Sequence, residues 1–172
     1  MKKSISLFAT AICAFVLFGC STSTPSTTLP DPVTETCTSS ETGVTISYKI
    51  TAPAQNQDIT QLGISINLTL ADLGLAQEDL DQVTEEDLQA FTDSLKEMYT
   101  QLLNTMYGIN PDDITVKTTK TNMTLNVFIS DLSAFEAKAS DDQKEALSHF
   151  FGGSYVFKDA ITSIEEQGFA CE

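Results

Sequence analysis

The sequence predicts an α+β domain, with an antiparallel sheet of four or five strands and three or four helices packed over one face. Several segments alternate apolar with polar residues, which is typical of strands that bury one face. Other segments space their apolar residues by three and four, which is typical of amphipathic helices. Thr, Ser and Asn occupy the alternate strand positions, so we expect the second face of the sheet to be wet.

The first half of the domain contains two clear strands. Residues 44–52 and 62–70 both alternate apolar with polar side chains, and a polar loop at 53–61 separates them. We expect these two strands to pair as a hairpin with a long loop. A short strand around Cys37, followed by a turn at 39–43, is expected to precede them.

The longest predicted helix begins after Thr84 and ends before Gly108. Thr84 is an N-cap residue, and the acids at 85–87 suit the positive end of the helix dipole. Gly108 and Pro111 terminate the helix. Its apolar residues form one stripe that we expect to face the core, namely Leu88, Phe91, Leu95, Met98, Leu102 and Met106.

The second half of the domain is predicted to hold another hairpin. Its strands cover 114–116 and 123–129, with a turn at 120–122. A short helical turn is expected at 130–138.

Two helices complete the expected fold. Ser140 and Gln143 have the spacing of a capping box, which predicts a helix that begins there and ends at Gly152-Gly153. A terminal helix is predicted over 157–164, with Gly168 as its stop and Phe169 folding back on it.

The first 19 residues have the form of a secretory signal peptide. Lys2 and Lys3 precede an apolar stretch at 5–18, and the small residue Gly19 precedes Cys20. A helix needs roughly 20 apolar residues to cross a bilayer, so this stretch of about 14 makes an uncleaved membrane span the weaker alternative.

The residues Leu17-Phe18-Gly19-Cys20 resemble the lipobox of bacterial lipoproteins. The resemblance implies cleavage after Gly19, a diacylglyceryl thioether on the Cys20 sulfur and often a further acyl chain, such as palmitate, on the new amino terminus. Two or more buried acyl chains anchor a protein stably. We therefore expect an extracytoplasmic protein that a lipid anchor holds at the bacterial cell membrane or outer membrane.

Three segments follow from this interpretation. Residues 1–19 are the signal peptide, 20–36 are the lipidated Cys20 and a flexible tether, and 37–172 are the single folded domain. The tether is rich in Ser and Thr, contains three prolines and has almost nothing to bury.

The charge of the chain excludes one class of partner. Two of the nine lysines leave with the signal peptide, so seven lysines oppose 24 acidic residues and the formal charge is −17. There is no Arg. Because phosphate binding needs clustered Lys or Arg, nucleic acid is not a natural partner.

Cys37 and Cys171 are expected to form a disulfide. Cys13 leaves with the signal peptide and Cys20 is acylated, so one pair of cysteines remains in an exported chain. Neither cysteine lies in a C-x-x-C setting, which makes a redox pair or a reactive thiol the weaker alternative.

Residue types that carry catalysis or bind metals do not gather in any known motif. His149 is the only histidine and has no Cys or His at ligand spacing, so we interpret it as structural or exposed. The pairs Glu78-Asp79, Asp112-Asp113 and Asp141-Asp142 lack the pattern of a calcium loop. No catalytic residue, metal ligand or cofactor is predicted.

Four motifs resemble those of the YehR-like small bacterial lipoproteins, in addition to the lipobox. They are the strand Gly43–Lys49, the tripeptides Asp72-Leu73-Gly74 and Ser130-Asp131-Leu132, and the ending Ser163–Phe169. The resemblance covers roughly 37–171 and implies an exported, lipid-anchored domain without assigning it any chemistry. The long tether, the acidity and the pair Cys37–Cys171 depart from the family pattern.

These observations predict a non-enzymatic envelope protein with a binding or structural role toward an unknown protein or peptide partner. One alternative is an acidic module that binds cations or cationic peptides. Another is a hydrolase with an unrecognised carboxylate site, which a deep pocket gathering acids from separate elements would support.

Overall fold

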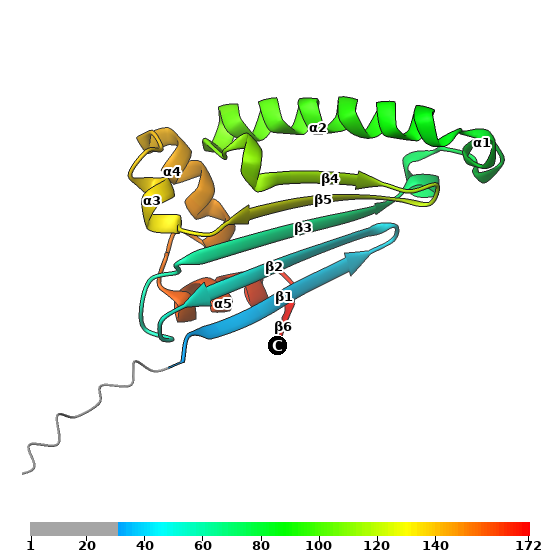
Figure 1. The fold of residues 1–172 in the computed structure, drawn as a ribbon. Coiled ribbons are helices and arrows are strands. Elements are labelled where there is room, and N and C mark those ends of the chain that lie inside the picture. Colours follow the sequence, from blue (N-terminus) through cyan, green and yellow to red (C-terminus); the bar gives the residue numbers. More distant parts are fainter. Residues whose placement is uncertain (1–30) are drawn as a thin grey trace, which may run out of the picture.

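The computed structural model describes residues 31–172, whose strands form one antiparallel sheet in the order β4-β5-β3-β2-β1-β6 (Figure 1). Five α-helices accompany the sheet in this part of the chain. The α+β class is therefore confirmed. The sheet has six strands where the sequence predicted four or five, because a terminal strand of two residues, β6 (Ala170–Cys171), adds to its edge.

Three consecutive strands form one side of the sheet. They are β1 (Val33–Glu41), β2 (Val44–Ala52) and β3 (Gln61–Thr69), and β2 pairs with β3 as the predicted long-looped hairpin. The strand expected around Cys37 is nine residues long and starts at Val33, because it pairs with β2 along its whole length. Gly43 closes the turn between β1 and β2 with a φ of 75°, a conformation that favours glycine.

The second predicted hairpin is also confirmed. β4 (Ile114–Thr118) pairs with β5 (Asn122–Ile129), and β5 continues the sheet by pairing with β3. β6 pairs with β1 at the opposite edge, so the two ends of the described chain lie beside each other.

The two faces of the sheet differ as the alternation predicted. The inner face carries the apolar side chains and packs against the helices, with α5 (Phe157–Glu166) behind β1 and β2 and α2 (Glu85–Tyr107) along the edge strand β4 (Figure 1). The outer face carries mainly Thr, Ser and Asn. The largest fully buried side chains belong to the inner face and to the helices, and they include Ile50, Leu62, Ile114, Leu147, Phe151 and Ile164.

Helix α2 has the predicted bounds but turns a different face toward the core. Thr84 caps its first turn by accepting a hydrogen bond from the Asp87 N–H, and Gly108 ends it with a φ of 72°. The predicted inward stripe is wrong for four of its residues, because Phe91, Met98, Leu102 and Met106 are 40 to 50% exposed.

A neighbouring stripe of α2 packs on the core instead. It consists of Leu95, Tyr99, Leu103 and Tyr107, which are half-buried. Successive residues of an α-helix are rotated by about 100° around its axis. The two apolar stripes, which are offset by one residue, therefore lie side by side on α2. Because α2 lies along the edge of the sheet, it buries only one of them. Of the predicted stripe, Leu95 does pack against the core.

Short helical segments connect these elements. Two of them, the 3₁₀ turn η1 (Leu70–Leu73) and α1 (Gln77–Gln82), lie in the stretch before Thr84 where the sequence predicted no helix. The helical turn expected at 130–138 is confirmed as α3 (Leu132–Glu136). The remaining segments are η2 (Pro111–Asp113), α4 (Asp141–Ser148) and η3 (His149–Phe151).

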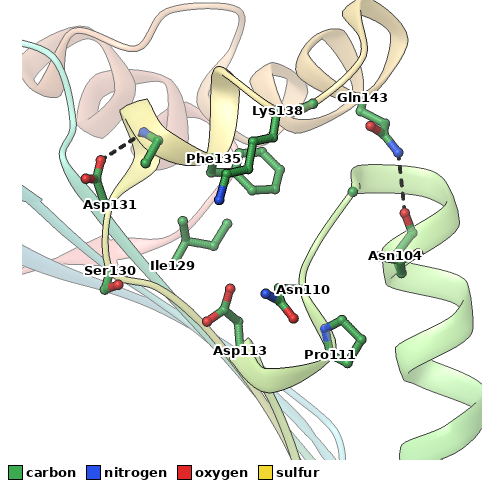
Figure 2. A pocket seen from close by; sticks show the side chains of 13 residues that line it. Asn104, Asn110, Pro111, Asp113, Ile129, Ser130, Asp131, Phe135, Lys138 and Gln143 are labelled. Atoms are coloured by element: carbon green, nitrogen blue, oxygen red, sulfur yellow. Dashed lines mark hydrogen bonds between the residues drawn. The ribbon is translucent and has the colours of Figure 1, made fainter.

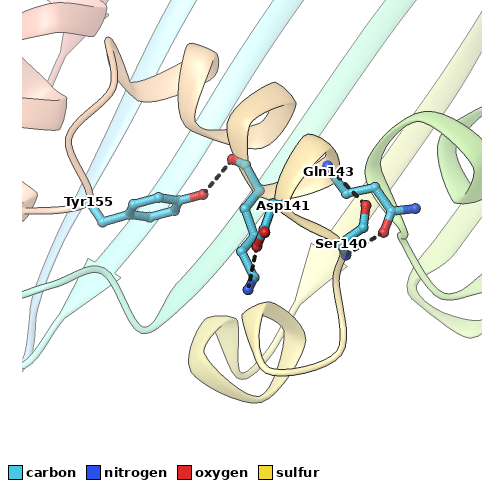
Figure 3. Close-up of polar contacts among 5 residues, drawn as sticks. Ser140, Asp141, Gln143 and Tyr155 are labelled. Carbon is cyan, nitrogen blue, oxygen red and sulfur yellow. Dashed lines mark hydrogen bonds and ion pairs between the residues drawn. The ribbon is translucent and has the colours of Figure 1, made fainter.

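The capping box at the start of α4 is confirmed (Figure 3). The Gln143 N–H donates to the Ser140 hydroxyl at 3.3 Å, and the Ser140 N–H donates to Gln143 Oε1 at 3.0 Å. Gln143 Nε2 also reaches the Asn104 carbonyl at 3.4 Å, so the same side chain links α4 to the end of α2.

Replacing Ser140 with Ala is expected to lower the free energy of unfolding by about 1 kcal/mol, because the Gln143 N–H loses its acceptor. Urea denaturation monitored by circular dichroism measures this change. Ser94→Ala is the matched control, since the Ser94 hydroxyl only donates back to the Ala90 carbonyl on exposed α2. Equal effects of the two substitutions would contradict the assigned role of the cap.

Candidate functional site

The lipidation residues of the sequence analysis, Leu17, Phe18, Gly19 and Cys20, lie outside the described residues. The cysteine pair predicted with them lies inside and is bonded. Cys37 and Cys171 form a disulfide with an S–S distance of 2.02 Å. The two cysteines face each other across β1 and β6, and Cys37 is fully buried.

The disulfide fastens the carboxy terminus to the first strand. Two main-chain hydrogen bonds accompany it, from Thr36 N to the Glu172 carbonyl at 2.9 Å and from Glu172 N to the Thr36 carbonyl at 3.1 Å. The Phe169 ring packs against the sheet, where its centroid lies 5.0 Å from that of Tyr48 on β2. The terminal strand is therefore held by covalent, polar and aromatic contacts.

A pocket of about 450 Å³ lies where the end of α2 meets α3 (Figure 2). Its volume falls in the range of small-molecule sites. Asn110 and Asp113 come from the segment between α2 and β4, and Ser130 and Asp131 follow β5. Figure 2 shows the Lys138 side chain crossing the opening toward Asp113 and Asn110, with the Phe135 ring beside it. The pocket is thus polar on one side and aromatic on the other.

The two carboxyl groups of this pocket have different surroundings. Burial, followed by the nearby charge of Asp112, raises the pKa of Asp113. The pKa of Asp131 is lowered, first by the hydrogen bond from the Ala134 N–H at 2.9 Å and then by that from the Ser133 hydroxyl. Asp131 is the N-cap of α3, so its carboxylate already stabilises the fold.

Lys138 lines the pocket together with two carboxyl groups, Asp113 and Asp131, and its charge is the last of the contributions that lower the pKa of Asp131. Among residues 31–172, Lys144 and Asp141 form the one ion pair with an N···O distance within 4.0 Å. They lie 3.6 Å apart at the exposed start of α4 (Figure 3). Lys138 and Asp113 are therefore not joined in an ion pair. A small ligand that carries both a negative and a positive group would meet a partner for each of them here.

A second cavity, of about 180 Å³, lies under the last turns of α2 and is almost entirely apolar. Ile46, Ile64 and Ile66 of the sheet form its floor, and Tyr107 and Phe150 lie against it. The ring centroids of Tyr107 and Phe150 are 5.4 Å apart. Burial, followed by Tyr107, raises the pKa of Tyr48 in the same cavity. This space reflects the part of the inner face that α2 and α5 leave thinly covered.

Tyr155 joins α4 to the segment before α5. Its hydroxyl donates to the Lys144 carbonyl at 3.1 Å (Figure 3). Burial first, and then the neighbouring Glu136, raise the pKa of this tyrosine to about 12. The hydroxyl therefore stays protonated at neutral pH and acts as a structural donor.

The histidine and two of the acidic pairs considered in the sequence analysis lie apart from both cavities. His149 is exposed at the start of η3. Glu78-Asp79 and Asp141-Asp142 occupy the first turns of α1 and α4, where the helix dipole favours acids. Within residues 31–172, no three His, Cys, Asp or Glu side chains come together as metal ligands. None of the helices in that range is long and apolar enough to cross a bilayer.

Sequence reasoning missed the main residues of the polar pocket. Asn110 could have been found from the sequence, because Asn immediately before Pro is typical of a helix N-cap. Its side chain does accept a hydrogen bond from the Asp112 N–H at 3.2 Å. Lys138 and Phe135 had no such signal. They come close to Asp113 only because β4 and β5 pair in the sheet.

These features define the chain as a disulfide-closed α+β domain with a six-stranded antiparallel sheet. No family model and no curated protein matches the sequence. Among solved structures, the chain is similar to an NMR structure of a protein from Streptococcus pneumoniae TIGR4, with 10% sequence identity and a TM-score of 0.52. That match covers 100% of this chain and 94% of the other, and it shows a shared fold.

Proposed function

We propose that this chain is a non-enzymatic, lipid-anchored protein of the bacterial cell envelope, whose domain binds a partner or ligand outside the cytoplasm. The observation that carries the proposal is the bond between Cys37 and Cys171. Structural disulfides persist in oxidising compartments and are rare in the cytosol, so a buried bridge agrees with the export that the signal peptide and lipobox predict.

The position of the domain in the chain also supports an anchored protein. Strand β1 begins at Val33, twelve positions after the first residue of the Ser, Thr and Pro segment that follows Cys20. A coil of that length spans about 20 Å, which is enough to hold a domain away from a lipid surface. The predicted anchor and the folded domain are therefore compatible.

The polar pocket supports the binding of a small ligand. Asp113 and Asp131 are its two carboxyl groups, and Asp131 uses Oδ1 for both hydrogen bonds that it accepts at the start of α3. Glycoside hydrolysis also uses two carboxyl groups that flank the bond to be cleaved, so a hydrolase stays the alternative to a binding protein. With two carboxyl groups, one ammonium group and the Asn110 amide, the pocket is suited to holding a small polar ligand.

Labelling of cells with a radioactive fatty acid tests the anchor. The wild-type protein is expected to carry label and to partition with membranes, and Cys20→Ser is expected to lose both properties, because the thioether cannot form. Cys13→Ser is the matched control and should remain labelled, since that residue leaves with the signal peptide. Label that persists on Cys20→Ser would refute the anchor.

A further inference from the structure

The outer face of the sheet is an ordered array of hydroxyl and amide groups. The register of β1 to β5 sets its side chains in rows that run across the strands. One row contains Thr36, Lys49, Gly63 and Phe128, and the next contains Thr38, Ser47, Ser65 and Asn126. No helix crosses this face of β1 to β3 in Figure 1. A partner would therefore meet the array directly.

Neighbouring strands hold parts of this array in place. The Thr34 and Thr51 hydroxyls lie 2.9 Å apart, and those of Thr38 and Ser47 lie 3.0 Å apart. Asn67 Nδ2 donates to the Thr124 hydroxyl at 2.9 Å. Each hydroxyl has one donor and two acceptor positions, so these pairs are ordered and still have capacity for a further hydrogen bond.

The outer face of the sheet carries few charged side chains, and Glu172, opposite Thr36 at the β6 edge, is an acid on it. The outward positions of β1 to β5 include Lys49 and Lys117 and no Asp or Glu, although the chain has 24 acidic residues. Opposed charges are screened over about 8 to 10 Å at physiological salt. An anionic group over Gly63 would thus lie nearest to Lys49 on the adjacent strand, whereas Glu172 lies three strands away at the β6 edge.

A depression on this face lies over Gly63. Its volume is about 210 Å³, and Lys49 and Phe128 stand on either side of it. A Cβ atom on Gly63 would meet Lys49 Cβ at 3.5 Å and Phe128 Cδ2 at 3.8 Å, which are ordinary contacts. Packing alone therefore does not require glycine here. Phe128 is 52% exposed, the largest exposure among the large apolar side chains of the described chain.

We propose that the outer face binds an anionic glycan, a chain of sugar or polyol units that carries carboxylate or phosphate groups. One sugar ring lies in the depression over Gly63 with its apolar side against Phe128. Its anionic group pairs with Lys49, and the hydroxyls and amides of the adjacent rows hydrogen-bond the neighbouring units. Nucleic acid fits less well, since it would need a denser cluster of cationic side chains.

This inference goes beyond the proposed function, because it assigns a polymer ligand to a face that is distinct from the polar pocket. It does not depend on the anchor either. The experiment uses the mature chain with Cys20→Ser, so that lipid is absent, and with the bond between Cys37 and Cys171 closed. Failure of the lipid labelling and failure of glycan binding are then separate results.

Calorimetric titration with three probes of matched length tests the proposal. Oligogalacturonate carries both sugar rings and carboxylates, dextran has the rings alone, and poly-L-glutamate has the carboxylates alone. We expect binding of oligogalacturonate that weakens with added salt, and at least tenfold weaker binding of the other two probes. Equal binding of dextran or of poly-L-glutamate, or no binding of oligogalacturonate, would overturn the proposal.

Substitutions locate the site. Phe128→Ser is expected to weaken oligogalacturonate binding about tenfold through the loss of stacking. Lys49→Gln is expected to weaken it several-fold and to flatten its salt dependence. The matched controls are Phe91→Ser and Lys158→Gln, which remove an exposed aromatic ring and a lysine from the helical side. Equal losses in the controls would refute the assigned face.

Gly63→Val keeps the test independent of protein stability. Valine suits a strand, and its methyl groups fill the depression while Phe128 and Lys49 remain. We expect this variant to keep the wild-type thermal midpoint and to lose about tenfold in affinity. Wild-type affinity of Gly63→Val would overturn the proposed position of the sugar ring.

Discussion

The variant Cys37→Ala/Cys171→Ala is expected to unfold with a free energy about 5 kcal/mol below that of the wild type. The bridge joins residues 134 positions apart, so it removes much of the conformational freedom of the unfolded chain. Since domains of this size are stable by about 5 to 15 kcal/mol, the loss takes a large share of the total. Urea denaturation at 15 °C, followed by circular dichroism, measures it.

Reduced wild-type protein is the control for this experiment. It loses the bond but keeps both sulfur atoms, so it separates the effect of the cross-link from that of the small cavity that an alanine leaves at buried Cys37. We expect reduced wild type to be at least as stable as the double variant and far less stable than the oxidised protein. The same urea midpoint for oxidised wild type and for the double variant would contradict a stabilising bridge.

Phe151→Ala is expected to lower the free energy of unfolding by about 3 to 5 kcal/mol. Phe151 is fully buried in η3, where it joins the end of α4 to α5. Its ring centroid lies 5.6 Å from that of Tyr155. Removing the ring leaves a cavity that three connected elements have to line, and they have little freedom to close it.

Phe91→Ala supplies the comparison for this substitution. Phe91 is the same residue type but is 40% exposed on α2. We expect the free energy of unfolding to fall by about 1 kcal/mol or less, because truncating a partly exposed side chain loses little buried apolar area. Thermal unfolding of Phe151→Ala and Phe91→Ala under identical conditions compares their stabilities. A larger loss for Phe91→Ala than for Phe151→Ala would contradict the described core.

Most of the sheet was predictable because its side chains alternate with a period of two. In β2, for example, Tyr48, Ile50 and Ala52 are buried, while Lys49 between them is exposed. One face of each strand is covered by helices and the other is open to water. The alternation of apolar and polar residues therefore shows which side chains of a strand are buried.

The orientation of α2 could not be predicted in this way. Its sequence has two apolar stripes side by side, and a single helix does not reveal which of them a neighbour will cover. Position against β4 decides that Tyr99 and Tyr107 turn inward while Met98 and Met106 stay exposed. Tyrosines suit this half-buried layer, because the ring is apolar and the hydroxyl still reaches water.

The polar pocket and the outer face also depend on long-range pairing. Lys138 and Asp113 are 25 positions apart and share a pocket because β4 and β5 form a hairpin. Lys49, Gly63 and Phe128 lie on three different strands, and only the register of β2, β3 and β5 places them in one row. Neither arrangement has a local motif.

The sequence by itself determined the α+β class, the two hairpins, the caps of α2 and α4 and the pairing of Cys37 with Cys171. Each of these follows from short-range periodicity, from local hydrogen bonding at a helix end or from the count of available cysteines. The tertiary structure alone decided which stripe of α2 is buried and which side chains meet over Gly63 and beside Lys138. Those outcomes depend on contacts between distant segments, whose free energies are set by the packing of the whole domain.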